Sequence, residues 1–135
     1  MEAIKISSEL LEELKQIALY DPEHLPAEIK LIELFLKRHP ANTQIACFDT
    51  SFHTTMPHIA KLLPIPIKFF NKGIQRYGFH GLSYAYLLQQ VQNIGGINPA
   101  KHKVILAHLG NGASLAAIKN GNALIQVWAL LLHPV

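Results

Sequence analysis

The segment Val104–Asn120 constrains the fold most, because two short apolar runs here flank a glycine loop. Lys103–His108 is too short and too β-branched for a helix, and Ala113–Ile118 mirrors it. Asn120-Gly121 then supplies the two positive-φ residues that a two-residue hairpin turn requires. The sequence therefore predicts a strand, a tight loop, a second strand and a hairpin turn.

The loop Gly110-Asn111-Gly112 joins the two predicted strands. Glycine has no Cβ, so the backbone N–H groups of such a loop can converge on an anion, and a phosphate fits that chemistry. The same residues are ordinary turn formers, and on the loop alone a plain hairpin tip is the favoured interpretation. His108 adds a possible donor just before the loop and leaves both interpretations open.

The rest of the chain predicts an α/β protein without internal repeats. A cap at Ser7 or Ser8 begins a first amphipathic helix, and Ala27–Lys37 has the periodicity of a second. Gln44–Phe48 reads as a short apolar strand, and a further helix runs through Tyr84–Gln92. Helices therefore precede the predicted hairpin.

Asp49 comes directly after the predicted strand Gln44–Phe48, which we expect to be buried. An acid at the end of a buried strand is a common arrangement for a catalytic carboxylate in α/β proteins. Asp49 can also cap the turn that follows it, and the pattern alone slightly favours this second interpretation.

Two histidines have structural interpretations on pattern alone. His53 is typical of a packing or surface histidine. His80 lies between Phe79 and Gly81, where a neighbour can approach the backbone closely, and a lone histidine in such a place is usually structural. The eight histidines lack the spacing of a zinc site, so we expect no zinc.

Composition excludes several classes of protein. The chain has 135 residues, half of them hydrophobic, which suits one domain with a real core. Its formal charge of +3 comes from scattered bases, so we expect no nucleic-acid partner. No stretch is long enough for a membrane span, so we expect no membrane association. A single Cys47 and no signal-like N-terminus indicate the cytoplasm.

Three motifs follow one another over about seventy residues, a spacing read directly from the sequence. They are Phe48-Asp-Thr-Ser-Phe-His-Thr-Thr-Met-Pro57, Arg76-Tyr-Gly-Phe-His-Gly-Leu-Ser83 and Ala107-His-Leu-Gly-Asn-Gly-Ala-Ser-Leu115. In order and spacing they resemble the acetate kinase family, which includes propionate kinases. The resemblance runs from about Ile6 to Asn122.

The resemblance implies an α/β fold of the actin-like ATPase (ribonuclease H-like) type. That fold has two domains, each with helices on a mixed sheet, and binds ATP and substrate between them. This chain is then a fragment of it, with helices, part of a mixed sheet and a C-terminal β-hairpin. The family is typically a homodimer.

The implied activity is a phosphotransfer from ATP to a short carboxylate. ATP and acetate, or propionate, give an acyl phosphate and ADP, with Mg²⁺ as cofactor and small molecules as partners. The sequence does not choose between acetate and propionate. Catalysis of this kind depends mostly on positioning and on donors that neutralise charge on the transferred group.

The resemblance also assigns roles to residues. Asp49 corresponds to an active-site acid and His80 to a histidine that stabilises the transition state, which makes these two the predicted catalytic residues. Phe79 corresponds to a wall of the pocket for the substrate methyl group. No metal ligand is expected within this chain. The predicted ATP phosphate-binding residues are His108, Leu109, Gly110, Asn111 and Gly112.

The chain departs from the family at several places. Gly81-Leu-Ser-Tyr84 replaces Gly-Thr-Ser-His, so a second histidine is absent. The phosphate and magnesium segment and the first arginine of the family precede its Phe-Asp-Thr and are absent here. The second arginine, the adenosine loops and a magnesium-linked glutamate follow later in the family. Residues 1–122 are therefore expected to be a partial kinase region that is inactive alone.

The segment 123–135 suggests a frameshift. The family continues there with Ile-Asp-Thr-Ser-Met-Gly-Phe-Thr-Pro, and codons for that string, read from the second base, can give the Leu-Ile-Gln-Val-Trp-Ala-Leu-Leu-Leu of Leu124–Leu132. We therefore expect an out-of-frame tail. The alternative is a natural buried strand, Ile125–Leu132.

Two other functions stay open from the sequence. The chain can be a non-catalytic remnant that requires the missing segments from elsewhere. It can also be a small module that binds phosphate or nucleotide at Gly110–Gly112 without chemistry.

Overall fold

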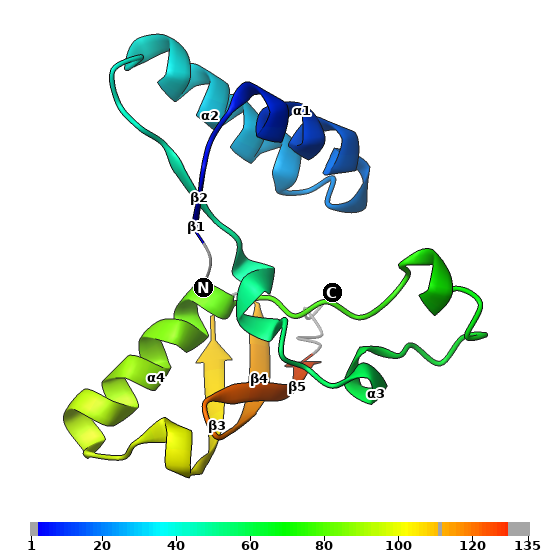
Figure 1. Cartoon of the computed structure of the whole chain (residues 1–135), viewed down its shortest axis with the longest axis vertical. Coiled ribbons are helices and arrows are strands. Elements are labelled where there is room, and N and C mark those ends of the chain that lie inside the picture. Colours follow the sequence, from blue (N-terminus) through cyan, green and yellow to red (C-terminus); the bar gives the residue numbers. More distant parts are fainter. Residues whose placement is uncertain (1–2, 111, 130–135) are drawn as a thin grey trace, which may run out of the picture. The chain divides into compact units, whose positions relative to one another are not determined.

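A computed structural model describes residues 3–110 and 112–129 of the chain. The described residues form two compact units, one of residues 3–47 and the other of residues 48–110 and 112–129. Figure 1 shows the helices and strands of both units.

The first unit is a helical hairpin with a small two-stranded sheet. Its elements are β1 (Ala3–Lys5), α1 (Ser8–Ile17), α2 (Leu25–Arg38) and β2 (Ile45–Cys47). The Ser7 side chain caps α1 by accepting the Leu10 N–H, as predicted. Lys15 of α1 joins Glu33 of α2 at 2.9 Å, while apolar side chains from both helices are buried between them.

The structure of this unit differs from the sequence analysis in three ways. Strand β1 was not predicted, although it pairs antiparallel with β2. Helix α2 begins at Leu25, because Pro26 lies in the first turn where its missing N–H has no cost. Strand β2 is largely exposed rather than buried, because Ile45 and Cys47 are exposed and Ala46 is half-buried.

The second unit combines helices with a three-stranded sheet. The helices are α3 (His58–Lys61) and α4 (Gly81–Gly95), with single 3₁₀ turns at Asp49–His53, Phe70–Lys72 and Pro99–Lys101. The sheet has the order β3 (Lys103–Leu109), β4 (Ala113–Lys119), β5 (Asn122–Ala129). Helix α4 packs against one face of this sheet (Figure 1).

The turn between β4 and β5 has the geometry that the sequence predicts. Asn120 and Gly121 have φ angles of 53° and 79°, and Lys119 pairs with Asn122 across the turn. Both central residues are thus left-handed, which matches the right-handed twist of the flanking strands.

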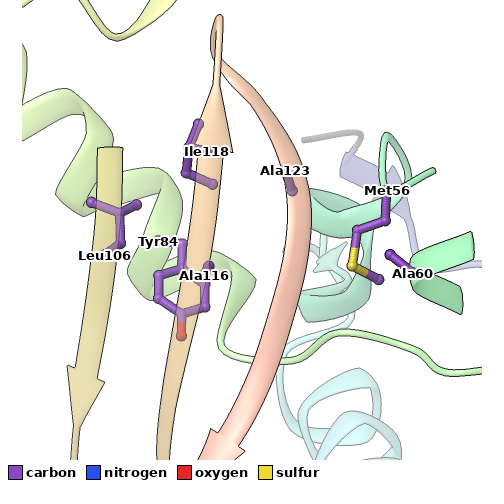
Figure 2. Packing of buried hydrophobic residues seen from close by; sticks show 7 residues of the cluster. All are labelled: Met56, Ala60, Tyr84, Leu106, Ala116, Ile118 and Ala123. Atoms are coloured by element: carbon purple, nitrogen blue, oxygen red, sulfur yellow. The ribbon is translucent and has the colours of Figure 1, made fainter. Parts of the chain in front are cut away.

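The core of the second unit lies between α4 and the sheet. Figure 2 shows Tyr84 of α4 beside side chains of β3 and β4, with Ala123 of β5, Met56 and Ala60 completing the cluster. The strand residues are Leu106, Ala116, Ile118 and Ala123. Side chains alternate along strands, so the opposite face carries apolar side chains that are exposed, among them Ile105 and Leu115.

The expected fold class is confirmed, with one difference. Helices and sheet are present, but every strand pairing within the described ranges is antiparallel, so this stretch contains none of the parallel pairs of a mixed sheet. The segment expected to be an out-of-frame tail contributes residues 123–129 to β5, and residues 130–135 lie outside the described part. No helix in the described ranges has the length and apolar character needed to cross a membrane.

Two glycine substitutions test the turn. Gly121→Ala forces a Cβ into a left-handed conformation, and we expect it to lower the free energy of unfolding by about 1–2 kcal/mol. Gly95→Ala is the control, because Gly95 is helical and its Cβ would make only ordinary contacts at 3.8 Å. Urea denaturation of both variants measures the difference, and equal midpoints would contradict the assigned turn.

Candidate active site

The Asp49 carboxylate holds the N-terminus of helix α4. Asp49 Oδ1 accepts the Leu82 N–H at 2.9 Å, and Asp49 Oδ2 accepts the His80 N–H. The first N–H groups of a helix have no partner within the helix, and the cap residue His80 supplies no side-chain bond of its own. The prediction that Asp49 caps the turn directly after it is therefore wrong, since its carboxylate caps a helix about thirty residues further along the chain.

Gly81 allows this close approach. A Cβ at Gly81 would lie 1.9 Å from the Asp49 carbonyl oxygen and 2.7 Å from Phe52 Cβ. Any side chain here would push the Asp49–His53 turn away from α4. Glycine is therefore required for the carboxylate to reach the helix end.

Asp49 is also electrostatically distinctive. It is the one acidic residue in the sequence after Glu33, whereas residues 48–135 contain seven Lys and Arg. The carboxylate thus lies in a basic unit, and backbone N–H groups occupy both of its oxygens.

His80 is held in an uncommon backbone conformation. Its φ and ψ are 58° and 25°, in the left-handed region that residues other than glycine rarely adopt. Such strain persists only where the surroundings enforce it, and it concentrates at functional sites. Here Asp49 holds the His80 backbone, and Ser114 Oγ lies 2.7 Å from His80 Nδ1.

The His80 ring lies over one row of the sheet. His108, Ser114 and Trp128 are register partners across β3, β4 and β5, and so they share one face. The ring of His80 stacks on His108 with centroids 4.0 Å apart and lies 4.9 Å from Trp128. His108 Nδ1 is itself 3.0 Å from Ser83 Oγ, so a serine hydroxyl anchors each imidazole.

The two Nε2 atoms lie beside the glycine loop. A Cβ at Gly112 would be 3.2 Å from His80 Nε2, and one at Gly110 would be 3.1 Å from His108 Nε2. The Gly110 N–H donates to the Gly112 carbonyl at 3.2 Å. That amide is therefore engaged within the loop, while the Nε2 atoms of His80 and His108 lie close to Gly112 and Gly110. Asn111, a predicted site residue, lies outside the described residues, and the predicted Leu109 is exposed.

The Phe79 peptide is fixed on both sides. Its N–H donates to Gln126 Oε1 at 2.9 Å, and its carbonyl accepts from Gln126 Nε2 at 2.9 Å and from His53 Nε2 at 2.8 Å. The ring of Phe79 remains 38% exposed and packs edge-on against Trp128. An apolar surface therefore lies one residue from His80.

His53 is a packing histidine, which is one of the two interpretations, packing or surface, that its pattern left open. It is buried against Gly78, whose Cβ would be 2.2 Å from His53 Cγ, and its ring lies edge-on to Tyr84. Burial lowers the pKa of His53, although its bond to the Phe79 carbonyl and the nearby Asp49 charge oppose this.

The His80 imidazole also favours its neutral form. Burial lowers the pKa of His80, the adjacent His108 imidazole lowers it further, and the Asp49 carboxylate acts in the opposite direction. A neutral imidazole has one N–H donor and one acceptor nitrogen.

The structure adds residues that the sequence did not predict as part of the site. Ser114 and Tyr84 are fully buried, and their hydroxyls lie 2.5 Å apart beneath His80. Two features of the sequence could have identified these residues. Tyr84 comes one helical turn after His80, and Ser114 pairs with His108 if the predicted hairpin closes symmetrically around its loop. Within the described ranges, no group of three or more His, Cys, Asp or Glu side chains could hold a metal ion.

Comparisons with known proteins agree on one family. The profile of the acetokinase family matches residues 1–127. Acetate kinase from Rickettsia typhi is 41% identical over 119 residues, covering 88% of this chain and 31% of the relative, and that from Dichelobacter nodosus is 43% identical over 124 residues. The Porphyromonas gingivalis acetate kinase structure has a TM-score of 0.85 and 38% identity, covering 94% of this chain and 32% of the other.

A propionate kinase structure from Francisella tularensis is equally similar, with a TM-score of 0.85 and 35% identity over 96% of this chain and 33% of the other. The chain belongs to the acetokinase family. It spans about a third of the length of the relatives it matches.

A pH titration tests the electrostatics of the site. The Cε1–H NMR signals of His53 and His80 should titrate below the ordinary value of 6.5, whereas that of His24, which Asp21 bonds at 2.9 Å, should titrate above it. The unfolded chain binds protons more readily at His53 and His80, so their contribution to stability is present above pH 6.5 and is lost as the pH falls below it. The reverse order of midpoints would contradict this assignment.

Proposed function

We propose that this chain is part of an acetate or propionate kinase, which transfers the γ-phosphoryl group of ATP to a short carboxylate. A carboxylate oxygen bonds to the γ-phosphorus while the bond between that phosphorus and the ADP oxygen breaks, giving an acyl phosphate and ADP. Membership of the acetokinase family supports the reaction class. The structural observation that supports the proposal most is the stacked pair His80 and His108, whose Nε2 atoms lie beside the glycine loop.

His80 would donate a hydrogen bond to the transferred phosphoryl group. Phosphoryl transfer depends on fixed donors that stabilise charge on the equatorial oxygens. His80 suits this role because Asp49 and Ser114 fix its backbone and ring. His108, Leu109, Gly110, Asn111 and Gly112 would contact the ATP phosphates, and the Gly110 N–H would have to leave the Gly112 carbonyl to take part.

Asp49 would act mainly by positioning His80, and Mg²⁺ would be held elsewhere. Mg²⁺ supplies charge neutralisation on phosphate oxygens and demands near-octahedral oxygen ligands. Among the described residues of the basic unit, no group of three or more His, Cys, Asp or Glu side chains could hold a metal ion, and Asp49, the unit's one carboxylate, accepts a backbone N–H on each oxygen. We therefore assign the Mg²⁺ ligands to parts of the family fold outside this chain.

Phe79 would form a wall of the acyl pocket. Its ring is partly exposed while three hydrogen bonds fix its peptide, so an apolar methyl or ethyl group can contact the ring without moving it. Acetate and propionate both satisfy this contact.

For the isolated chain, a non-catalytic role is the second candidate. The chain covers about 31% of the length of its relatives, so it would bind phosphate or nucleotide without completing the transfer. We also propose that residues 123–135 are read out of frame. The support is in the sequence, because codons for the family's Ile-Asp-Thr-Ser-Met-Gly-Phe-Thr-Pro, read from the second base, can give Leu124–Leu132.

Acyl-phosphate formation from ATP and acetate, trapped with hydroxylamine, tests the proposal. We expect no turnover by the 135-residue chain and turnover by a protein extended through the flanking reading frames. In the extended protein, His80→Ala should lower the rate about 10²–10³-fold, the usual loss for one transition-state donor. His102→Ala is the matched control, because His102 is exposed and lies outside the site.

Turnover by the chain alone would show that groups outside it are not required. An extended protein with full activity after His80→Ala would overturn the role of His80. Resequencing the gene tests the frameshift, which predicts Ile-Asp-Thr-Ser-Met-Gly in the neighbouring frame.

A further inference from the structure

The Ser114 hydroxyl is the meeting point of a buried polar network. Three polar atoms surround Ser114 Oγ: Tyr84 OH at 2.5 Å, His80 Nδ1 at 2.7 Å and Gln126 Nε2 at 3.0 Å. A serine hydroxyl has one proton to donate and two lone pairs to accept with. The direction of each bond can therefore be worked out from the partners.

Gln126 takes the first acceptor position. The Phe79 N–H can only donate, so the amide oxygen of Gln126 must face it, as the 2.9 Å bond has it. The amide nitrogen then faces both the Phe79 carbonyl and Ser114, and it donates to each.

Tyr84 takes the second acceptor position. The Tyr84 hydroxyl is fully buried, and its hydrogen-bond partner among the described residues is Ser114. A buried hydroxyl proton without an acceptor is destabilising, so Tyr84 donates to Ser114. With both lone pairs occupied, the single proton of Ser114 goes to His80 Nδ1.

We infer that Ser114 is a positioning residue that fixes His80 as the tautomer with its proton on Nε2. The Nε2–H then lies beside Gly112 and presents a donor at the glycine loop. This inference rests on the proposed function, because it explains how a neutral imidazole serves as a donor to a phosphoryl oxygen. In this chain, Tyr84 and Gln126 act through Ser114 by filling its acceptor positions. Gln126 lies in the stretch that we propose is out of frame, so its bond to Ser114 belongs to this chain, whereas Tyr84, His80 and Ser114 all precede that stretch.

The neighbouring His108 imidazole favours a neutral His80 ring over a charged one. His108 stacks on His80 at 4.0 Å, and two positive charges at that distance would repel each other. A tautomer fixed by hydrogen bonds supplies the donor without adding a charge. Burial and His108 both lower the pKa of His80, which agrees with a neutral ring.

Nitrogen NMR of the histidine side chains in the full chain, with no ligand present, tests the inference. We expect His80 Nε2 to have the shift of an N–H nitrogen and Nδ1 that of a bare ring nitrogen at neutral pH. A proton on Nδ1 would overturn the inference. This NMR measurement uses the unsubstituted chain, so it tests the His80 tautomer even if variants of the buried Ser114 do not fold.

Ser114→Ala removes the hydroxyl, and Ser83→Ala is the matched control beneath the neighbouring His108. We expect Ser114→Ala to move the His80 Nδ1 shift toward the N–H value and Ser83→Ala to leave it unchanged. If Ser114→Ala folds and the His80 tautomer is unchanged, Ser114 does not fix the tautomer and the inference is wrong. The tautomer is read without substrate, so absent acyl-phosphate formation by the extended protein contradicts the proposed function alone, and a proton on Nδ1 in the 135-residue chain contradicts this inference alone.

Discussion

The pair of hydrogen bonds from backbone N–H groups to the Asp49 carboxylate is the interaction on which the rest of the site depends. It joins the 3₁₀ turn after β2 to the start of α4 and holds His80 in a left-handed conformation that the chain would otherwise avoid. Gly81 makes the contact possible because any Cβ there would meet the Asp49 carbonyl. A charged acceptor suits helix N–H groups, since the helix N-terminus carries partial positive charge.

The sheet supplies the other half of the site. Register places His108, Ser114 and Trp128 in one row across three strands, and the His80 ring lies on that row. A helix end and a sheet row therefore converge at the glycine loop, each fixing a different part of His80. Under the proposed phosphoryl transfer, this convergence would provide the fixed hydrogen-bond donors on which that reaction depends.

Local sequence signals predicted the local structure. The Ser7 cap, the Asn120-Gly121 turn and the strands around Gly110–Gly112 all follow from residue type and spacing, and the structure contains each of them. Long-range partners could not be predicted in this way. The carboxylate of Asp49 bonds N–H groups about thirty residues away, and the buried bond of Tyr84 to Ser114 depends on how α4 packs on the sheet. The motifs identified His80 and His108, but only the fold brings their rings together.

Amide hydrogen exchange in the chain and in Asp49→Asn tests the central claim most directly. Asparagine keeps the shape of the side chain but replaces one acceptor oxygen with a donor, so the N–H of either His80 or Leu82 loses its partner. We predict that at least one of these two amides exchanges about tenfold faster or more in the variant, because a hydrogen bond to a charged group contributes about 1.5–3 kcal/mol. The Gly96 amide, which bonds the Gln92 carbonyl at the other end of α4, should be unchanged. Equal exchange of His80 and Leu82 in the two proteins would contradict the claim that Asp49 holds the helix end.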